Sequence, residues 1–449
     1  MSFLKRRLVE LELNPPRVLA MGFGGLILIG AILLNLPVAS KTGESIGFLN
    51  ALFTSASAVC VTGLVVVNTG EFWSLFGQIV IIILIQMGGL GFMTMATLVA
   101  LILGKKITLK ERLIIKEQLN QETMSGLVKL TKYVILATFS IEGIGAILLS
   151  TRFIPAYGFA KGVWFSIFHS ISAFCNAGFD IIGSSMVPFV GDIVVILTIS
   201  FLIIIGGLGF SVYIDISKNK KLVRLSLHSK LVLAITLILI VTGTILIYLI
   251  EWDNPATLYP LGVKDRVLAS FFQSVVTRTA GFNSVDIAKL EDTSVFIMII
   301  LMFIGGSPGS TAGGIKTTTF GAIILTTLTV IKGNKDVVAY KKRIPQEIIY
   351  RSLAIASVGV FLVTVVSLIL TLSEDATFLD LLFETTSAFG TVGLTRGVTP
   401  NLSNFGKVLI TLTMYSGRVG PLTMAFAFAK RQKSNSNSYR YSEGNILVG

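Results

Sequence analysis

The stretch SAFCNAGF, residues 172–179, ends an apolar segment that begins near Trp164 and is too short to cross a membrane. Its frame occurs four times in the chain. Aligned without gaps on one glycine, the copies read FTSASAVCVTG (53–63), FHSISAFCNAG (168–178), FFQSVVTRTAG (271–281) and FETTSAFGTVG (383–393). The aligned glycines recur about every 110 residues, and similarity at a fixed period is the signature of a repeat architecture. The sequence therefore predicts four copies of one structural unit.

The composition is that of an integral membrane protein. Of the 449 residues, 53% are hydrophobic and 14% are charged, whereas charged residues make up about 25% of a soluble domain. Long apolar runs such as WSLFGQIVIIILIQMGGLGFMTMATLVALIL (73–103) exceed the roughly 20 residues that a membrane-crossing helix needs. The two cysteines, Cys60 and Cys175, cannot build a disulfide framework and lack metal-ligand spacing.

Each copy of the frame lies between two long apolar runs, so the predicted unit is a span, a short re-entrant helix, an extended loop and a second span. The short segments reach about 18 Å, roughly half of a 30 Å bilayer core. The predicted fold class is all-α integral membrane, with four tandem helix/pore-loop/helix repeats, eight transmembrane spans and four re-entrant half-helices around a pseudo-fourfold pore. The eight predicted spans are 18–38, 73–103, 127–152, 190–216, 228–251, 292–330, 347–372 and 403–430.

The repeats divide the chain into six parts. These are a cytoplasmic N-terminus (1–17), pore repeat 1 (18–104), pore repeat 2 with its preceding cytoplasmic linker (105–217), pore repeat 3 (218–331), pore repeat 4 (332–430) and a cytoplasmic C-terminal tail (431–449). Most of the 37 Lys and Arg residues fall in loops on one side of this arrangement. This positive-inside pattern predicts a multi-pass protein of the cell membrane with both termini in the cytoplasm.

The end of each short helix is the predicted ion site. Four half-helices that enter from outside would direct their partly negative C-terminal ends at one point, a field that favours a cation. Glycine adopts backbone angles that let carbonyls face a common axis, and rings of carbonyls coordinate dehydrated monovalent cations. The alternative is that these glycines only allow close helix packing. The predicted selectivity filter comprises Val61, Thr62, Gly63, Asn176, Ala177, Gly178, Thr279, Ala280, Gly281, Thr391, Val392 and Gly393.

The second spans carry glycine-rich patches at 88–92, 206–210, 305–316 and 416–421. We interpret the first two, both GGLGF, as places where helices pack closely. The third, GGSPGSTAGGIK, cannot continue a helix and must line a cavity in the bilayer. It is the predicted gate, with a passive kink as the alternative. Its residues are Gly305, Gly306, Ser307, Pro308, Gly309, Ser310, Thr311, Ala312, Gly313, Gly314 and Lys316.

Isolated polar residues in the spans add further candidates. Arg418 falls at the position that matches the predicted gate, and we expect it to raise an electrostatic barrier in the pore or to pair with carbonyls of the gate. For Glu142 a helix–helix hydrogen bond is favoured over a transport role. His169 and Glu384 share one repeat position, where a wet outer vestibule and an ion site are equally open. Arg278 is expected to brace its loop, while Cys60 and Cys175 are expected to be small residues behind the filter.

These four loops, the glycine-rich interruption and Arg418 resemble the Trk/Ktr/HKT superfamily of potassium transporters. Texts such as GGLGFMT, TRTAGFNS and SAFGTVGLT are most similar to the membrane subunit of bacterial Ktr systems (KtrB or KtrD type), from about Pro15 to Lys430. The resemblance implies potassium uptake, with K+ as substrate at the filter carbonyls and Na+ as activator or co-ion. It also implies a homodimer and a cytoplasmic ring of nucleotide-binding regulatory subunits of the KtrA or KtrC type, with no covalently bound cofactor and no nucleic acid. Glycine at all four aligned positions points to potassium over sodium.

Two other functions are weighed against a filter-based transporter. An alternating-access, sodium- or cation-coupled carrier would also use broken helices, but typically within inverted repeats, whereas these four repeats share one orientation. A membrane-embedded enzyme would need a nucleophile or acid/base group of residues. The two histidines, His169 outside and His228 at the cytoplasmic edge, cannot form one together. We therefore expect that the chain is not an enzyme.

Overall fold

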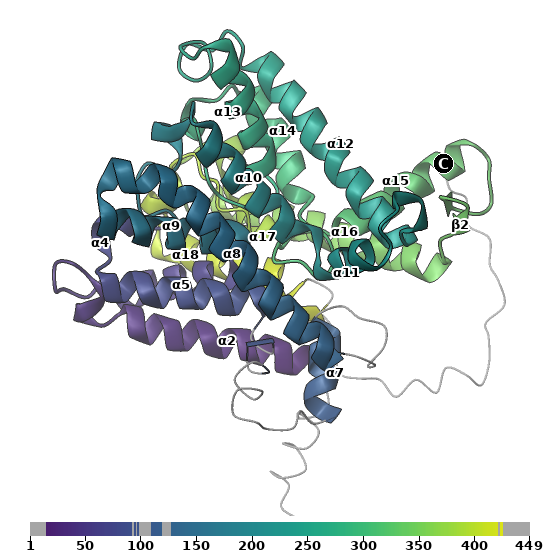
Figure 1. Ribbon diagram of the computed structural model, residues 1–449, viewed down its shortest axis with the longest axis horizontal. Coiled ribbons are helices and arrows are strands. Elements are labelled where there is room, and N and C mark those ends of the chain that lie inside the picture. The colour runs from purple at the N-terminus through teal and green to yellow at the C-terminus, as the bar shows by residue number, and fades with distance from the viewer. Residues whose placement is uncertain are drawn as a thin grey trace, which may run out of the picture.

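The computed structural model describes residues 15–91, 109–118 and 127–420, together with positions 94, 95, 97, 423 and 424. Within these residues the only strands are β1 (Val338–Ala339) and β2 (Lys342–Arg343), which form one antiparallel hairpin. The predicted C-terminal tail, residues 1–14 of the predicted N-terminus and the ends of the predicted spans 73–103 and 403–430 lie outside the described residues. Everything else in the architecture is helix and connecting loop (Figure 1).

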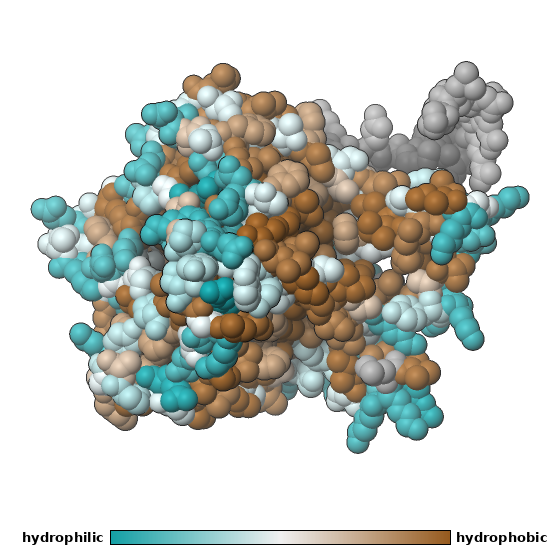
Figure 2. Space-filling model, turned by 90° about the horizontal axis from the view of Figure 1, so that it is seen from above, coloured by the Kyte–Doolittle hydropathy of each residue, from teal (hydrophilic) through white to brown (hydrophobic). Residues whose placement is uncertain are grey.

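One long apolar helix opens each repeat. These helices are α2 (Pro15–Leu34), α8 (Leu127–Tyr157), α12 (Leu227–Ile250) and α16 (Gln346–Leu370). Each contains a window long and apolar enough to cross a bilayer. Their outward residues are apolar as well, as Leu136 and Phe361 show with 70% exposure each. Figure 2 shows hydrophobic residues covering much of one face of the molecule, as expected for a surface in contact with lipid.

A short helix follows in each repeat and lies in the core. The four are α3 (Phe48–Cys60), α9 (Phe159–Phe174), α13 (Val263–Val276) and α17 (Phe378–Gly390), and each packs against the long helix that precedes it. A serine makes the same hydrogen bond to the long helix in three repeats. The donors are Ser55 to Ile27 O (2.7 Å), Ser170 to Glu142 O (2.6 Å) and Ser274 to Ile240 O (2.8 Å).

This serine bond corrects the ungapped alignment of the third frame. Ser274 stands two residues after Phe272, as Ser55 stands two residues after Phe53, and both phenylalanines are fully buried. The third repeat therefore has one residue fewer between this buried phenylalanine and its glycine. Before Thr277, each residue of the third frame therefore occupies a frame position one earlier than the ungapped alignment assigns to it.

The second helix of each repeat is shorter than predicted. These helices are α5 (Leu75–Leu90), α10 (Ile193–Leu208), α14 (Asp292–Phe303) and α18 (Asn404–Val419). At 1.5 Å per residue even the longest spans about 24 Å, less than a bilayer core. Among the described residues, four helices are long enough to cross a membrane, or five if α10 and α11 (Phe210–Lys218), bent by 90°, count as one span. Each predicted second span is therefore interrupted, an interruption that the sequence analysis expected only in the third repeat.

The interruptions fall at the glycine-rich patches. Helix α5 ends at Gly91, α10 at Gly209 and α18 at Gly420, and all three glycines have positive φ. Between α14 and α15 (Thr317–Ile331) the chain is non-helical through residues 304–316. The two GGLGF patches are thus more than packing sites, because each also terminates a helix. The expected close helix packing is present at Gly88, because a Cβ there would collide with the Val59 carbonyl oxygen.

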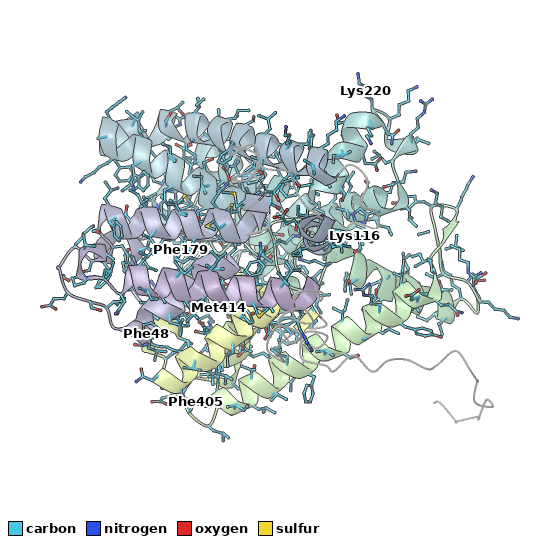
Figure 3. The ribbon with its side chains drawn as sticks, turned by 90° about the horizontal axis from the view of Figure 1, so that it is seen from below. Phe48, Lys116, Phe179, Lys220, Phe405 and Met414 are labelled. Carbon is cyan, nitrogen blue, oxygen red and sulfur yellow. The ribbon has the colours of Figure 1, made fainter. Side chains whose placement is uncertain are left out.

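The repeats close on one another in a cycle. Helix α5 contacts α9, α10 contacts α13, α14 contacts α17, and α18 returns to α3. Each second helix therefore packs against the short helix of the next repeat. Loops and short elements connect these helices. The short elements are α4 (Thr69–Phe72), α7 (Leu109–Gln118) and five 3-10 turns: η1 (Pro37–Ala39), η2 (Val187–Phe189), η3 (Leu222–Arg224), η4 (Ile287–Lys289) and η5 (Thr399–Asn401). Figure 3 shows Phe48 and Phe405 at one end and Lys116 and Lys220 at the other.

Candidate functional site

The four aligned glycines meet at the centre of this cycle. A Cβ on Gly63 would lie 2.5 Å from the Ala177 carbonyl oxygen, and one on Gly178 would lie 2.8 Å from that of Ala280. The third contact joins Gly281 to the Val392 carbonyl oxygen at 2.7 Å, and the fourth joins Gly393 to the Thr62 carbonyl oxygen. Each glycine thus faces the backbone of the next repeat, and the fourth faces the first. Only a residue without a Cβ fits these positions.

We call the three residues that end in each aligned glycine a glycine triplet. In every triplet the first residue and the glycine have positive φ, and the middle residue does not. The first residues, Val61, Asn176, Thr279 and Thr391, have φ between 50° and 67°. Alternation between left- and right-handed residues directs successive carbonyls to the same side of the chain. Three of these first residues are β-branched, for which this conformation costs about 1–3 kcal/mol. From the sequence, such backbone angles were expected only at the glycines.

Backbone bonds to the short helix hold each triplet. Thr62 N donates to Ser57 O (2.8 Å), and Val392 N donates to Ser387 O (2.8 Å). The same two serine hydroxyls accept from Gly63 N at 3.0 Å and Gly393 N at 3.1 Å. Sequence reasoning missed these serines as supports of the site. The available signal was a serine at the fifth position of three frames.

The second and third triplets are supported differently. Ala177 N donates to Ser172 O (2.7 Å), while the Ser172 hydroxyl donates to Phe179 O (2.8 Å). In the third repeat, Ala280 N reaches Val276 O (3.0 Å), a shorter turn that matches the missing residue there. The Asn176 amide, oriented to satisfy its bonds, donates to Ala173 O and Ile203 O. The Asn176 side chain is therefore bound to backbone carbonyls of α9 and α10.

The predicted gate, the glycine-rich segment 305–316, bonds to the broken helix of repeat 2. Ser307 N donates to Gly207 O (2.9 Å) and Thr311 N to Gly206 O (3.2 Å). In return, Phe210 N donates to Gly309 O (3.0 Å). A helix end has orphan carbonyls and a helix start has orphan amides, and both kinds must be satisfied when buried. The segment supplies partners to both sides of the α10–α11 break.

The glycine-rich segment also touches the triplets. The Thr311 hydroxyl lies 3.2 Å from Phe174 O, at the end of short helix α9. A Cβ on Gly313 would collide with the side chain of Thr391, the first residue of the fourth triplet. Within the segment, Gly305 N donates to Ile315 O at 2.9 Å, so its two ends are held together. The segment therefore contacts the fourth triplet and the end of the short helix that leads into the second triplet.

Arg418, in repeat 4, forms hydrogen bonds with residues of repeats 1 and 3. Its guanidinium donates to Thr311 O in the glycine-rich segment and to Gly88 O and Gly89 O at the end of α5. Lys316 Nζ donates to Ala312 O at 2.7 Å. A cavity of about 250 Å³ borders both residues and is also lined by Pro308, Gly314 and Arg351. Arg418 thus pairs with one carbonyl of the glycine-rich segment, Thr311 O, and it places positive charge beside the cavity.

The remaining polar residues that the sequence singled out are buried and lie outside the triplets themselves. The helix–helix hydrogen bond expected for Glu142 is present, since Gln86 Nε2 donates to Glu142 Oε2 at 3.2 Å. Cys60 and Cys175 are fully buried. Arg278 is also buried, and among the described residues its Nε and Nη2 have no hydrogen-bond partner, so the expected bracing bonds from these atoms are missing.

His169 and Glu384 are not in a wet vestibule, because both side chains have 0% exposure. His169 Nε2 lies 2.9 Å from Asp180 Oδ1, and Glu384 accepts hydrogen bonds from Thr395 and Thr399. Burial alone would raise the pKa of the Asp180 carboxyl, but hydrogen bonds from His169 and from two backbone amides outweigh burial and lower it. Asp180 is therefore a charged carboxylate near neutral pH.

The fold and the site together define a multi-pass membrane protein with buried, non-helical backbone at its centre, an arrangement that lines a pathway in proteins that move ions or solutes. The chain belongs to the TrkH family of cation transport proteins, whose pattern it matches over residues 23–440.

Several relatives of the chain have names that specify the ions they take up. The chain is 46% identical to Ktr system potassium uptake protein B of Bacillus subtilis, over 100% of both chains. It is 43% identical to the potassium/sodium uptake protein NtpJ of Enterococcus hirae, again over 100% of both. Among solved structures, the potassium transporter TrkH from Vibrio parahaemolyticus superposes with a TM-score of 0.72 at 17% identity, covering 91% of this chain and 83% of that one.

Proposed function

We propose that this chain takes up potassium across the cell membrane through an opening surrounded by the four glycine triplets. The observation that carries the proposal is the closed cycle of contacts from Gly63 through Gly178 and Gly281 to Gly393. A potassium ion must lose its water shell to pass, and backbone carbonyls can replace that shell. Four short helices ending at this point add a partly negative field. The names of the relatives, which specify potassium uptake, support potassium as the ion.

The twelve triplet residues are the proposed selectivity filter, and the glycine-rich segment is the proposed gate. The segment contacts Thr391 of the fourth triplet at Gly313 and lines the cavity beside Lys316 and Arg418, which supports a position for it on the path of an ion that leaves the filter. Arg418 holds the segment through Thr311 O and adds an electrostatic barrier for cations. Movement of the segment would open the path, and the broken helices α10 and α11 would have to move with it.

A regulatory partner and a dimer complete the proposal. The relatives are components of Ktr systems, which supports a cytoplasmic partner subunit, and we propose a nucleotide-binding ring that acts on the gate. Basic residues such as Lys116 and Lys220 lie toward the end opposite Phe48, the first residue of short helix α3 (Figure 3). This distribution supports cytoplasmic termini and a cytoplasmic docking surface. Sodium is proposed as an activator or co-ion, in keeping with the potassium/sodium relative.

The test is potassium uptake by cells that lack their own uptake systems, grown at submillimolar potassium with and without co-expressed partner subunit. The parent should restore growth, and Gly281→Ala should not, because its Cβ would lie 2.7 Å from the Val392 carbonyl oxygen. Gly143→Ala is the matched control, since nothing lies within 4 Å of its added Cβ. Equal growth of the two variants would overturn the proposed filter. Repeating the assay with and without sodium decides whether sodium stimulates uptake.

A further inference from the structure

In three of the four repeats, the residue at the second position of the repeated frame contacts the chain that leaves the glycine triplet. With the third repeat shifted by one residue, the residues at this position are Thr54, His169, Gln273 and Glu384. Three of them reach across to the segment just after the glycine. His169 contacts Asp180, Glu384 accepts from Thr395 at 2.7 Å, and Gln273 Oε1 accepts from Ser284 N at 3.3 Å. Thr54 instead donates to Asn50 O of its own helix.

The contact in repeat 2 is the one made by an ionisable pair. His169 is surrounded by aromatic rings, with Phe153 at 5.6 Å and Phe165 and Phe282 at 6.2 Å between centroids. Its Nδ1 lies 2.7 Å from Phe165 O, and its Nε2 lies 2.9 Å from Asp180 Oδ1. Both neighbours are hydrogen-bond acceptors. The two bonds therefore form together only when both ring nitrogens carry protons.

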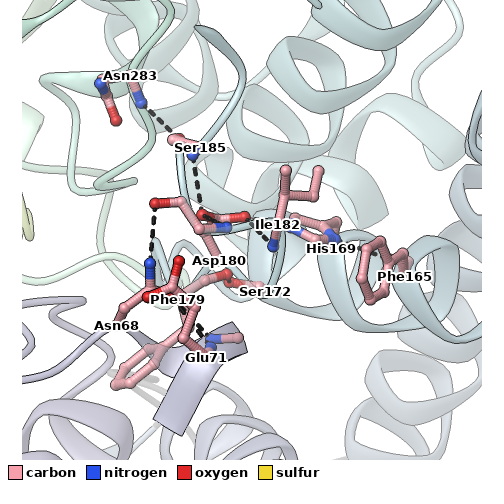
Figure 4. A network of polar contacts seen from close by, with 12 residues as sticks. Asn68, Glu71, Phe165, His169, Ser172, Phe179, Asp180, Ile182, Ser185 and Asn283 are labelled. Atoms are coloured by element: carbon pink, nitrogen blue, oxygen red, sulfur yellow. Dashed lines mark hydrogen bonds and ion pairs between the residues drawn. The ribbon is translucent and has the colours of Figure 1, made fainter. Parts of the chain in front are cut away.

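Asp180 passes this restraint to the loop that follows. Its carboxylate accepts from the amides of Ile182 (2.7 Å), Gly183 (2.8 Å) and Ser185 (2.8 Å), as Figure 4 shows. These bonds fold residues 180–185 into a compact turn around one carboxylate. Charge-assisted bonds of this kind are stronger than neutral ones.

The turn is in contact with both neighbouring repeats. Asn68 of repeat 1 donates to Gly183 O at 3.2 Å. Asn283 N of repeat 3 donates to the Ser185 hydroxyl at 2.9 Å, and Met186 N donates to Asn283 O at 2.9 Å. Asn283 stands two residues after Gly281. Asp180 thus links His169 to the loops that follow three of the four triplets.

We propose that His169 and Asp180 form a positioning pair that determines how well the triplet ring discriminates potassium from sodium. The inference rests on the proposed function of the ring. Carbonyl oxygens replace the hydration shell of an ion in such a filter, and in this proposal the fixed position of these oxygens favours the larger ion. Gly178 is fixed on one side by the short helix and on the other by the chain that Asp180 holds. Without the contact between His169 and Asp180, the Gly178 carbonyl can move toward the smaller sodium ion.

The test measures competition between potassium and sodium for uptake by the full chain in proteoliposomes. His169→Phe keeps the aromatic packing and removes both hydrogen bonds. We expect the potassium-to-sodium ratio to fall about tenfold, while the maximal potassium rate stays within about twofold of the parent. Thr395→Val tests the equivalent contact with Glu384 and should lower the ratio by a smaller factor. Thr54→Val is the matched control and should leave the ratio unchanged.

The outcomes separate the inference from the function. If the parent prefers potassium and His169→Phe keeps the parental ratio, the positioning role is wrong and the filter stands. If the parent shows no preference between the ions, the proposed filter itself fails. Should His169→Phe not reach the membrane folded, Asp180→Asn, which removes the charged acceptor of the pair, decides in its place. A loss of rate at constant ratio in these variants would indicate a role in folding only and would also overturn the inference.

Discussion

The Thr311 hydroxyl in the glycine-rich segment lies 3.2 Å from the carbonyl oxygen of Phe174, the last residue of short helix α9. It lies 3.0 Å from Gly206 O as well. One side chain of the proposed gate is therefore in contact with the short helix that leads into the second triplet and with the broken end of α10. In the proposed mechanism, opening of the gate breaks these contacts, so they stabilise the closed state.

Thr311→Val should favour the open state. Valine has the same shape and lacks the hydroxyl, and a hydrogen bond of this kind contributes about 1 kcal/mol, so potassium flux without the partner subunit should rise about fivefold. The measurement is potassium flux into proteoliposomes. Thr326→Val is the control, because the Thr326 hydroxyl bonds only within its own helix to Ala322 O. Flux equal to that of the control would contradict the gate assignment.

Arg418→Met should make the pathway leak. The variant removes the donor to Thr311 O and Gly88 O and also removes a positive charge from the cavity wall. We expect flux to rise and its dependence on the partner subunit to weaken. Arg351→Met, at the same cavity, separates charge from contact. If both variants raise flux equally, the barrier is electrostatic, and if only Arg418→Met does so, the bonds to the segment hold the gate closed. Unchanged flux in both would refute a role for Arg418.

Gly63→Ser should lower the selectivity for potassium. At φ +95° a serine is strained, and its Cβ would lie 2.5 Å from the Ala177 carbonyl oxygen. Strain of about 1–3 kcal/mol at this position is enough to change the potassium-to-sodium ratio about tenfold. Competition between the two ions for uptake measures the ratio. Gly143→Ser, at an open helical site, should behave as the parent. A parental ratio in Gly63→Ser would count against the ring of carbonyls.

Glu142→Leu should destabilise the protein, and Glu142→Gln should not. Gln86 Nε2 donates to Glu142 Oε2, and glutamine in place of the acid still offers an oxygen. Leucine leaves the buried Gln86 amide without this partner, which costs about 1–3 kcal/mol. Thermal unfolding in detergent should show a lower midpoint for the leucine variant only. Equal midpoints for all three proteins would show that the bond contributes nothing measurable.

Part of the site was predictable because its signals are local. The frame around Gly178 recurs with its text nearly intact, and the residues beside it are apolar over fixed lengths. Arg418 could be placed near the glycine-rich segment from repeat position alone. The αL conformation of Val61 and Thr391 was not predictable, since β-branched residues normally avoid it and only surrounding contacts maintain it.

The sequence by itself determined a membrane protein of four repeats, because hydropathy and periodicity are properties of neighbouring residues. The tertiary structure decided where the second helices end. A break at Gly209 inside a membrane protein is tolerable only if donors and acceptors come from elsewhere, and here they come from Ser307, Thr311 and Gly309 in the next repeat. The contact of Arg418 with Gly88 joins residues 330 positions apart. Pairings of that range follow from how the repeats close on one another, which no local pattern specifies.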